Sequence, residues 1–133
     1  MLEHMKPDSR HMAFVAGIAL GVFLLLVSGP GRAEPTDEVE ETIQYLMKSV
    51  SGSSLTFFRN GSSYTPSEAA EHMNRKYQHF MDDIETPEEF IELCATKSLL
   101  TGKFYLVVDG QGKERRTSDW LRAELAAYQE RNQ

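Results

Sequence analysis

An uninterrupted apolar run at residues 12–27 limits how much of this 133-residue chain can fold as a domain. Lys6 and Arg10 precede the run, and Gly31-Arg32-Ala33 follows it with small residues at the first and third positions, as in signal-peptide cleavage sites. The run is shorter than the roughly 20 residues of a membrane-spanning helix. The sequence therefore predicts a cleaved signal peptide at 1–33, cut between Ala33 and Glu34, and a single mature domain at 34–133. A leader retained as an anchor is the alternative.

The charge of the mature segment argues against two classes of partner. Three of the 14 basic and two of the 20 acidic residues lie in the leader, which leaves 11 against 18 and a net charge near −7. Such a surface repels phosphate backbones and anionic lipid headgroups, and no basic stripe interleaved with aromatic residues is present. We therefore expect no nucleic-acid partner. The leader pattern predicts a periplasmic or secreted location and no integral membrane domain after cleavage.

Cys94 is the single cysteine, so the mature domain cannot form an intrachain disulfide. It lies in an apolar helical context at residues 90–95, which favours a buried and unreactive thiol. Pairing between two chains is the alternative for an unmatched cysteine in an exported protein. We expect a monomer or a weak homodimer.

Apolar spacing and capping signals predict four helices. Apolar residues recur at helical spacing after Pro35, with Asp37 as the expected cap of the first helix. Thr65-Pro66-Ser67-Glu68 and Thr86-Pro87-Glu88-Glu89 are capping boxes with proline at the first helical position, and each predicts a helix start. Thr117 or Ser118 is the expected cap of the last helix. The predicted helical ranges are 37–50, 66–84, 87–95 and 117–128.

Two runs of aromatic and β-branched residues predict strands at 55–59 and 104–108, and we expect them to pair. Asn60-Gly61 follows the first run and predicts a tight turn, because both residues accept positive φ. The polar residues 112–116 predict a mobile connection. The expected fold is a single small α+β domain with about four helices packed with a two-stranded antiparallel β-ribbon.

Several short strings recur in a familiar order and spacing between residues 38 and 126. They are Arg59-Asn60-Gly61, Tyr64, Ala69-Ala70-Glu71-His72-Met73, Lys76-Tyr77, Phe90-Ile91, Ala95-Thr96-Lys97-Ser98, Gly102-Lys103-Phe104-Tyr105 and Asp119-Trp120-Leu121-Arg122-Ala123-Glu124-Leu125. In these strings the chain resembles the YfeK-like family of small exported bacterial proteins, a domain of unknown function. The resemblance implies the family's fold and export, and it implies no activity. Family members often carry one cysteine before the Phe-x-Arg-Asn-Gly string and another after the late strand, where this chain has Leu55 and Val108 or Asp109. No bridge between the strands is therefore expected.

The second predicted helix carries a polar stripe beside its apolar one. Glu68, His72, Lys76, His79 and Asp83 follow one another at spacings of four, four, three and four. A proton-transfer or carboxylate-binding surface is one interpretation, but a solvated helix face joined by ion pairs is favoured because such pairs are common. His72 and His79 are two turns apart, roughly 10 Å along the axis, so no metal site is expected.

Arg59, Asn60 and Tyr64 form a second candidate site. A guanidinium at a strand end beside a turn can clamp a carboxylate or a phosphate. A structural role is favoured, because turn chemistry already accounts for Asn60-Gly61. Ser98 has no nucleophile elbow around it, and capping a turn is its expected role.

These observations support two functional hypotheses. The first is a non-catalytic envelope module that binds another exported protein or a peptide, with strand addition to the ribbon edge as one route. The second is a small-ligand binder or hydrolase with a site around Arg59, His72, Lys76 and Tyr105. No catalytic residue and no cofactor is predicted.

Overall fold

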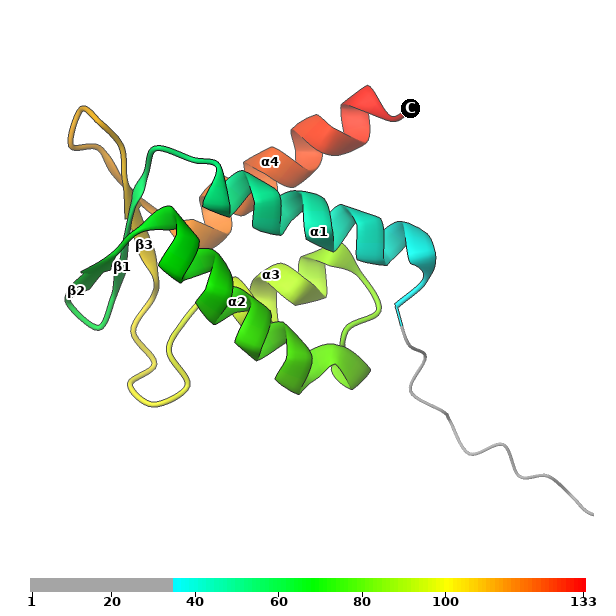
Figure 1. The fold of residues 1–133 in the computed structure, drawn as a ribbon, viewed down its shortest axis with the longest axis horizontal. Helices are drawn as coiled ribbons and strands as arrows, with labels where there is room; N and C mark the ends of the chain where they lie inside the picture. The colour runs from blue at the N-terminus through cyan, green and yellow to red at the C-terminus, as the bar shows by residue number, and fades with distance from the viewer. Residues whose placement is uncertain (1–34) are drawn as a thin grey trace, which may run out of the picture.

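The computed structural model describes residues 35–133, and the expected signal peptide with its cleavage point between Ala33 and Glu34 lies outside the described residues. The helices pack together as one group, and the sheet stands at one end of it (Figure 1). In chain order the elements are α1 (Asp37–Ser51), β1 (Thr56–Arg59), β2 (Ser62–Tyr64), α2 (Pro66–Phe80), the 3₁₀ helix η1 (Met81–Asp83), α3 (Pro87–Ala95), β3 (Leu106–Val108), β4 (Glu114–Arg116) and α4 (Thr117–Arg131).

Side-chain caps determine where three of the helices begin. Thr36 caps α1 by accepting a hydrogen bond from the N–H of Val39, so the cap lies one residue before the predicted Asp37. The capping boxes predicted for α2 and α3 are confirmed. Thr65 and Thr86 each accept from the N–H of the glutamate three residues later, and that glutamate accepts from the threonine N–H.

The predicted caps Thr117 and Ser118 of the last helix are wrong. Arg116 occupies the N-cap position without a side-chain cap, and both predicted residues lie buried in the first turn of α4. The chain passes directly from β4 into α4, so the strand fixes the helix start without a cap. The second predicted helix also ends earlier than residue 84, because η1 replaces its last turn.

A four-stranded antiparallel sheet in the order β2-β1-β3-β4 replaces the predicted two-stranded ribbon. The predicted pairing of the two runs is confirmed at its centre, where Phe57 lies opposite Val107. The correction concerns two short polar strands that flank this pair. β2 follows the tight turn, and β4 occupies the stretch predicted as a mobile connection. Their side chains are mostly exposed, so neither strand shows the apolar alternation that reveals a half-buried strand.

The turn between β1 and β2 has the conformation that its residues predict. Asn60 has φ 51° and Gly61 has φ 80°, and Arg59 pairs with Ser62 across this two-residue loop. The turn returns the chain at once, so Tyr64 lies opposite Phe57 on the neighbouring strand. The hairpin thus brings Arg59 on β1 and Tyr64 on β2 to the same end of the molecule.

The core lies between the helices and one face of the sheet. α2 packs against both α1 and α3, and the Tyr77 and Phe90 rings meet edge to face with centroids 5.7 Å apart. The Tyr77 hydroxyl also donates to the Glu40 carboxylate and so ties α2 to α1. Cys94 is fully buried, as predicted. Within residues 35–133, no helix combines the length and the apolar character that crossing a membrane requires.

Candidate functional site

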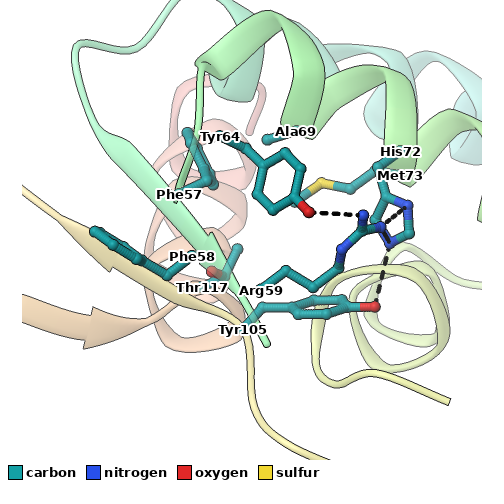
Figure 2. Close-up of a pocket in the computed structure, with 9 residues that line it drawn as sticks. All are labelled: Phe57, Phe58, Arg59, Tyr64, Ala69, His72, Met73, Tyr105 and Thr117. Atoms are coloured by element: carbon teal, nitrogen blue, oxygen red, sulfur yellow. Dashed lines mark hydrogen bonds between the residues drawn. The ribbon is translucent and has the colours of Figure 1, made fainter. Parts of the chain in front are cut away.

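Four separate segments bring the candidate residues together where α2 meets the sheet. Arg59 ends β1, Tyr64 ends β2, and Tyr105 lies just before β3. His72 and Lys76 are one turn apart on α2, so their side chains leave the same side of the helix. Figure 2 shows the Arg59 side chain running between the Tyr64 and Tyr105 rings, with His72 at its tip.

The Arg59 guanidinium is bonded to two of these residues. Its Nη1 lies 2.5 Å from Nδ1 and 3.0 Å from Nε2 of His72, and its Nη2 donates to the Tyr64 hydroxyl at 3.1 Å (Figure 2). A guanidinium can only donate, so His72 accepts through an unprotonated nitrogen. We assign this acceptor to Nδ1 from the shorter contact. The Nε2–H group then donates to the Tyr105 hydroxyl, 3.2 Å away.

Lys76 is a lysine held almost completely out of solvent, with 8% of its surface exposed. Its Nζ donates to the backbone carbonyl of Lys97 at 3.1 Å and to the Tyr105 hydroxyl at 3.3 Å. The oxygen of Tyr105 therefore accepts from both Lys76 and His72, and its own O–H is left to donate elsewhere. No described residue accepts that proton in this arrangement.

The pKa values in the groove reflect burial first and nearby charge second. Burial, and then the charges of Arg59, Lys76 and Arg75, lower the pKa of His72 from 6.5 to about 4. Burial is also the main cause that lowers the pKa of Lys76 and raises the pKa of Tyr105. His72 is thus neutral at neutral pH, as its role as an acceptor from Arg59 requires.

Carboxylates do not balance these cations within the described part of the chain. No ion pair there involves Arg59 or Lys76, and the pair that α2 does form, Arg75 with Glu71 at 3.9 Å, joins two exposed side chains. Among residues 35–133, no three His, Cys, Asp or Glu side chains gather as metal ligands. The site therefore presents hydrogen-bond donors and positive charge without a matching anion.

These residues line a groove of about 320 Å³. Ser62 and Tyr64 of β2 lie on one wall, and Ser98, Leu99 and Leu100 lie on another. A smaller cavity of about 30 Å³ shares the Arg59, Tyr64, His72 and Tyr105 side chains with the groove and extends to Thr117. The Thr117 hydroxyl is buried and has no hydrogen-bond partner among residues 35–133. The remaining side chains of that cavity are Phe57, Phe58, Ala69 and Met73.

Asn60 ties the hairpin turn to the segment that forms this second wall. Its Nδ2 donates to the Ser98 hydroxyl at 3.3 Å, and its Oδ1 accepts from the Thr101 hydroxyl at 2.6 Å. The Ser98 hydroxyl also accepts from the N–H of Thr101 at 3.4 Å, which confirms the turn role predicted for this serine. Asn60 therefore lines the groove, and its two hydrogen bonds also hold in place the segment that carries Leu99 and Leu100.

The structure brings all six candidate residues to one groove, namely Arg59, Asn60, Tyr64, His72, Lys76 and Tyr105. The interpretation of His72 and Lys76 as part of a solvated helix face is wrong, because both turn toward the sheet and bond there. Glu68 is occupied in the α2 capping box, and His79 is exposed. Sequence reasoning missed Leu99 and Leu100, although two adjacent leucines in a polar segment before Gly102 were a usable signal.

Comparisons with known proteins place the groove inside a shared domain. A family model described as "Family of unknown function (DUF5329)" matches residues 37–129, a range that contains all six candidate residues. The chain is 33% identical over 89 residues to the uncharacterized protein YfeK of Salmonella typhimurium, an alignment that covers 66% of this chain and 74% of that protein. No solved structure matches the chain.

Proposed function

The chain belongs to DUF5329, a family of unknown function, and from the groove that this domain carries we propose that it is an exported binding protein that captures an anionic oxygen group, a carboxylate or a phosphate. Export rests on the leader pattern at residues 1–33. Binding rests on the groove. Arg59 and Lys76 would hold the anion, and the free O–H of Tyr105 would donate to it.

The observation that carries this proposal is the unpaired charge of Lys76. A cation taken out of water is costly unless an opposite charge or strong hydrogen bonds compensate it. Lys76 donates to a carbonyl and a hydroxyl and lies 5.1 Å from the centroid of the Tyr105 ring. Arg59 donates to an imidazole and a hydroxyl and lies 4.7 Å from the centroid of the Tyr64 ring. Among residues 35–133, no carboxylate forms an ion pair with either cation. An anion between the two side chains would supply the missing opposite charge in a site where solvent screens it weakly.

Binding is favoured over hydrolysis by the bonding of His72. In the tautomer assigned above, Nδ1 accepts from Arg59 and Nε2–H donates to Tyr105, so neither ring nitrogen is left to take a proton from a nucleophile. A general base needs a free acceptor within reach of the proton that it removes. The groove is therefore proposed as a binding site without a catalytic base.

The test is an NMR titration of the His72 ring with sodium acetate and, separately, with inorganic phosphate, on protein purified from an exporting host. A bound anion offsets the positive charges around His72, so we expect it to raise the pKa of His72 above about 4. A raised pKa in the complex means that binding takes up a proton. Affinity for the ionised form of the anion should therefore increase as the pH falls through the raised pKa of the complex toward about 4.

Matched variants separate a specific site from general charge. Arg59→Ala and Lys76→Met should weaken binding by about tenfold or more, because each removes a charge-assisted donor. Arg75→Ala is the control, since Arg75 is an exposed cation on the same helix. If neither anion gives a saturable shift, or if Arg75→Ala weakens binding as much as Arg59→Ala, the proposal is wrong. Arg59→Lys provides a second variant if Arg59→Ala does not fold.

A further inference from the structure

The groove is lined by two cationic side chains, Arg59 and Lys76, and by two leucines, Leu99 and Leu100. We call the first pair the cationic floor and the second pair the apolar wall. Leu99 is 68% exposed and Leu100 is 95% exposed. Among the described residues, the large hydrophobic side chains that are exposed are these two and Phe104, and all three belong to the single segment between α3 and β3. Exposed apolar side chains that gather in one place are typical of interaction sites.

The apolar wall is held in a fixed position. Asn60 bonds to Ser98 and Thr101 on either side of the two leucines, and Lys76 bonds to the carbonyl of Lys97 just before them. A surface that is already ordered loses little conformational entropy when a ligand binds. The leucines are thus presented beside the cationic floor rather than left on a free loop.

The outer strand of the sheet, β2, also lines the groove. β2 pairs only with β1 in the described sheet, so its other edge has backbone groups without a strand partner. An extended peptide can add to such an edge through main-chain hydrogen bonds. A groove of about 320 Å³ lies at the lower end of the range for ligand sites, which suits the end of a chain better than its middle.

We propose that the groove receives the C-terminus of a peptide or of another exported protein whose last side chain is apolar. The terminal carboxylate would bind Arg59, Lys76 and Tyr105, and the last side chain would pack on Leu99 and Leu100. A C-terminal residue carries a carboxylate and an apolar side chain on one carbon atom, which matches a cationic floor next to an apolar wall. This inference rests on the proposed anion site and names its ligand.

Fluorescence polarisation with three labelled pentapeptides tests the inference. The first ends in leucine with a free carboxylate, the second is the same peptide with a C-terminal amide, and the third ends in serine with a free carboxylate. We expect the first to bind. The amide should bind about tenfold more weakly or worse, because it loses the charge, and the serine peptide should lose about fivefold or more from lost apolar contact.

Two variants connect the peptide to the walls of the groove. Leu100→Ser should weaken binding of the leucine peptide and leave the acetate titration of His72 unchanged, whereas Arg59→Ala should weaken both. Phe104→Ser is the matched control, because Phe104 is exposed in the same segment but stacks with Arg116 outside the groove, 3.8 Å from ring centroid to guanidinium carbon. It should leave peptide affinity unchanged.

Each outcome separates this inference from the anion site. If the amide binds as well as the acid, the C-terminal proposal is wrong, and the acetate titration alone decides whether the anion site stands. If acetate binds and the leucine peptide does not, the C-terminal proposal is wrong while the anion site stands. If the serine and leucine peptides bind equally, the role of the apolar wall is wrong. If neither acetate, phosphate nor the leucine peptide binds, both proposals fail together.

Discussion

Thr117, beside the small cavity, carries a fully buried hydroxyl without a hydrogen-bond partner in the described part of the chain. An unpaired buried hydroxyl costs about 1–3 kcal/mol. Valine has nearly the same shape and lacks the hydroxyl, and the backbone bond from the Thr117 N–H to the Tyr105 carbonyl survives the change. We therefore expect Thr117→Val to stabilise the protein by about 1 kcal/mol, measured by urea unfolding.

Thr96 provides the control for this prediction, because its buried hydroxyl does donate a bond, at 2.8 Å, to the Ile91 carbonyl. Thr96→Val should destabilise the protein by about 1 kcal/mol, since it leaves that carbonyl without this partner. Equal destabilisation by the two substitutions would contradict the prediction. It would mean that the Thr117 hydroxyl is bonded in solution, as it would be by a water in the cavity of about 30 Å³.

The residue types in the groove were predictable from the sequence, but their grouping was not. The four-residue spacing of His72 and Lys76 shows that they share a helix face. Which way that face turns depends on Tyr105, which is 33 residues beyond His72 and is brought there by the pairing of β1 with β3. Spacing alone therefore favoured a solvated face. The register of β1 with β3 instead places Tyr105 where both His72 and Lys76 bond to it.

The starts of α2 and α3 use the same capping chemistry, so they form a natural pair for testing. Thr86→Ala removes an acceptor for the Glu89 N–H, and Thr65→Ala removes one for the Glu68 N–H. We expect each substitution to lower the free energy of unfolding by about 1 kcal/mol. Urea unfolding of the two single variants and of the double variant checks this, with nearly additive losses because the caps are on different helices.

Ser67→Ala is the control for the capping variants. Ser67 lies in the first turn of α2, is exposed, and is not a member of the capping box. Its removal should change the free energy of unfolding by less than about 0.5 kcal/mol. A loss equal to that of Thr65→Ala would show that any polar side chain in this turn matters and that the box does not.

An element could be predicted from the sequence where its own residues carry the signal that specifies it. α2 and α3 carry their start signals in the chain itself, and β1 and β3 carry apolar residues that must be buried, so all four were predicted. β2 and β4 are short and polar and bury little, and Glu114–Arg116 is exposed throughout. Strands of this kind are specified by the neighbour that they pair with, and a sequence pattern cannot show that neighbour.

At the scale of the whole molecule, the groove lies at the end of the helical group where the sheet stands, and α1 begins at the opposite end (Figure 1). The chain expected to precede the domain therefore joins it far from the groove. Residues 34–133 have a net charge near −7, yet the groove itself is cationic. A local positive site on an acidic protein selects for ligands with a concentrated negative charge, because the general surface repels extended anionic partners.

The packing of the whole domain also determines how reactive the Cys94 thiol is. Its side chain is fully buried in α3, and burial raises the pKa of its thiol to about 12, against an opposing effect of Lys76. The thiolate is the reactive form of cysteine, so native protein at neutral pH should react with a thiol reagent such as DTNB only when it opens. For a domain with an opening free energy of about 5 kcal/mol or more, the rate should fall at least about a thousandfold below that of an exposed thiol.

Gln111→Cys supplies the exposed reference, because Gln111 is an exposed residue in the turn between β3 and β4. This variant should react quickly with one equivalent of reagent and slowly with a second, whereas the native chain should show only the slow phase. Urea should convert the slow phase to a fast one in both proteins, in step with the loss of helical circular dichroism. Fast labelling of the native chain, or a disulfide-linked dimer on a non-reducing gel, would contradict the prediction, since a thiol that reaches another chain must first leave the core between α2 and α3.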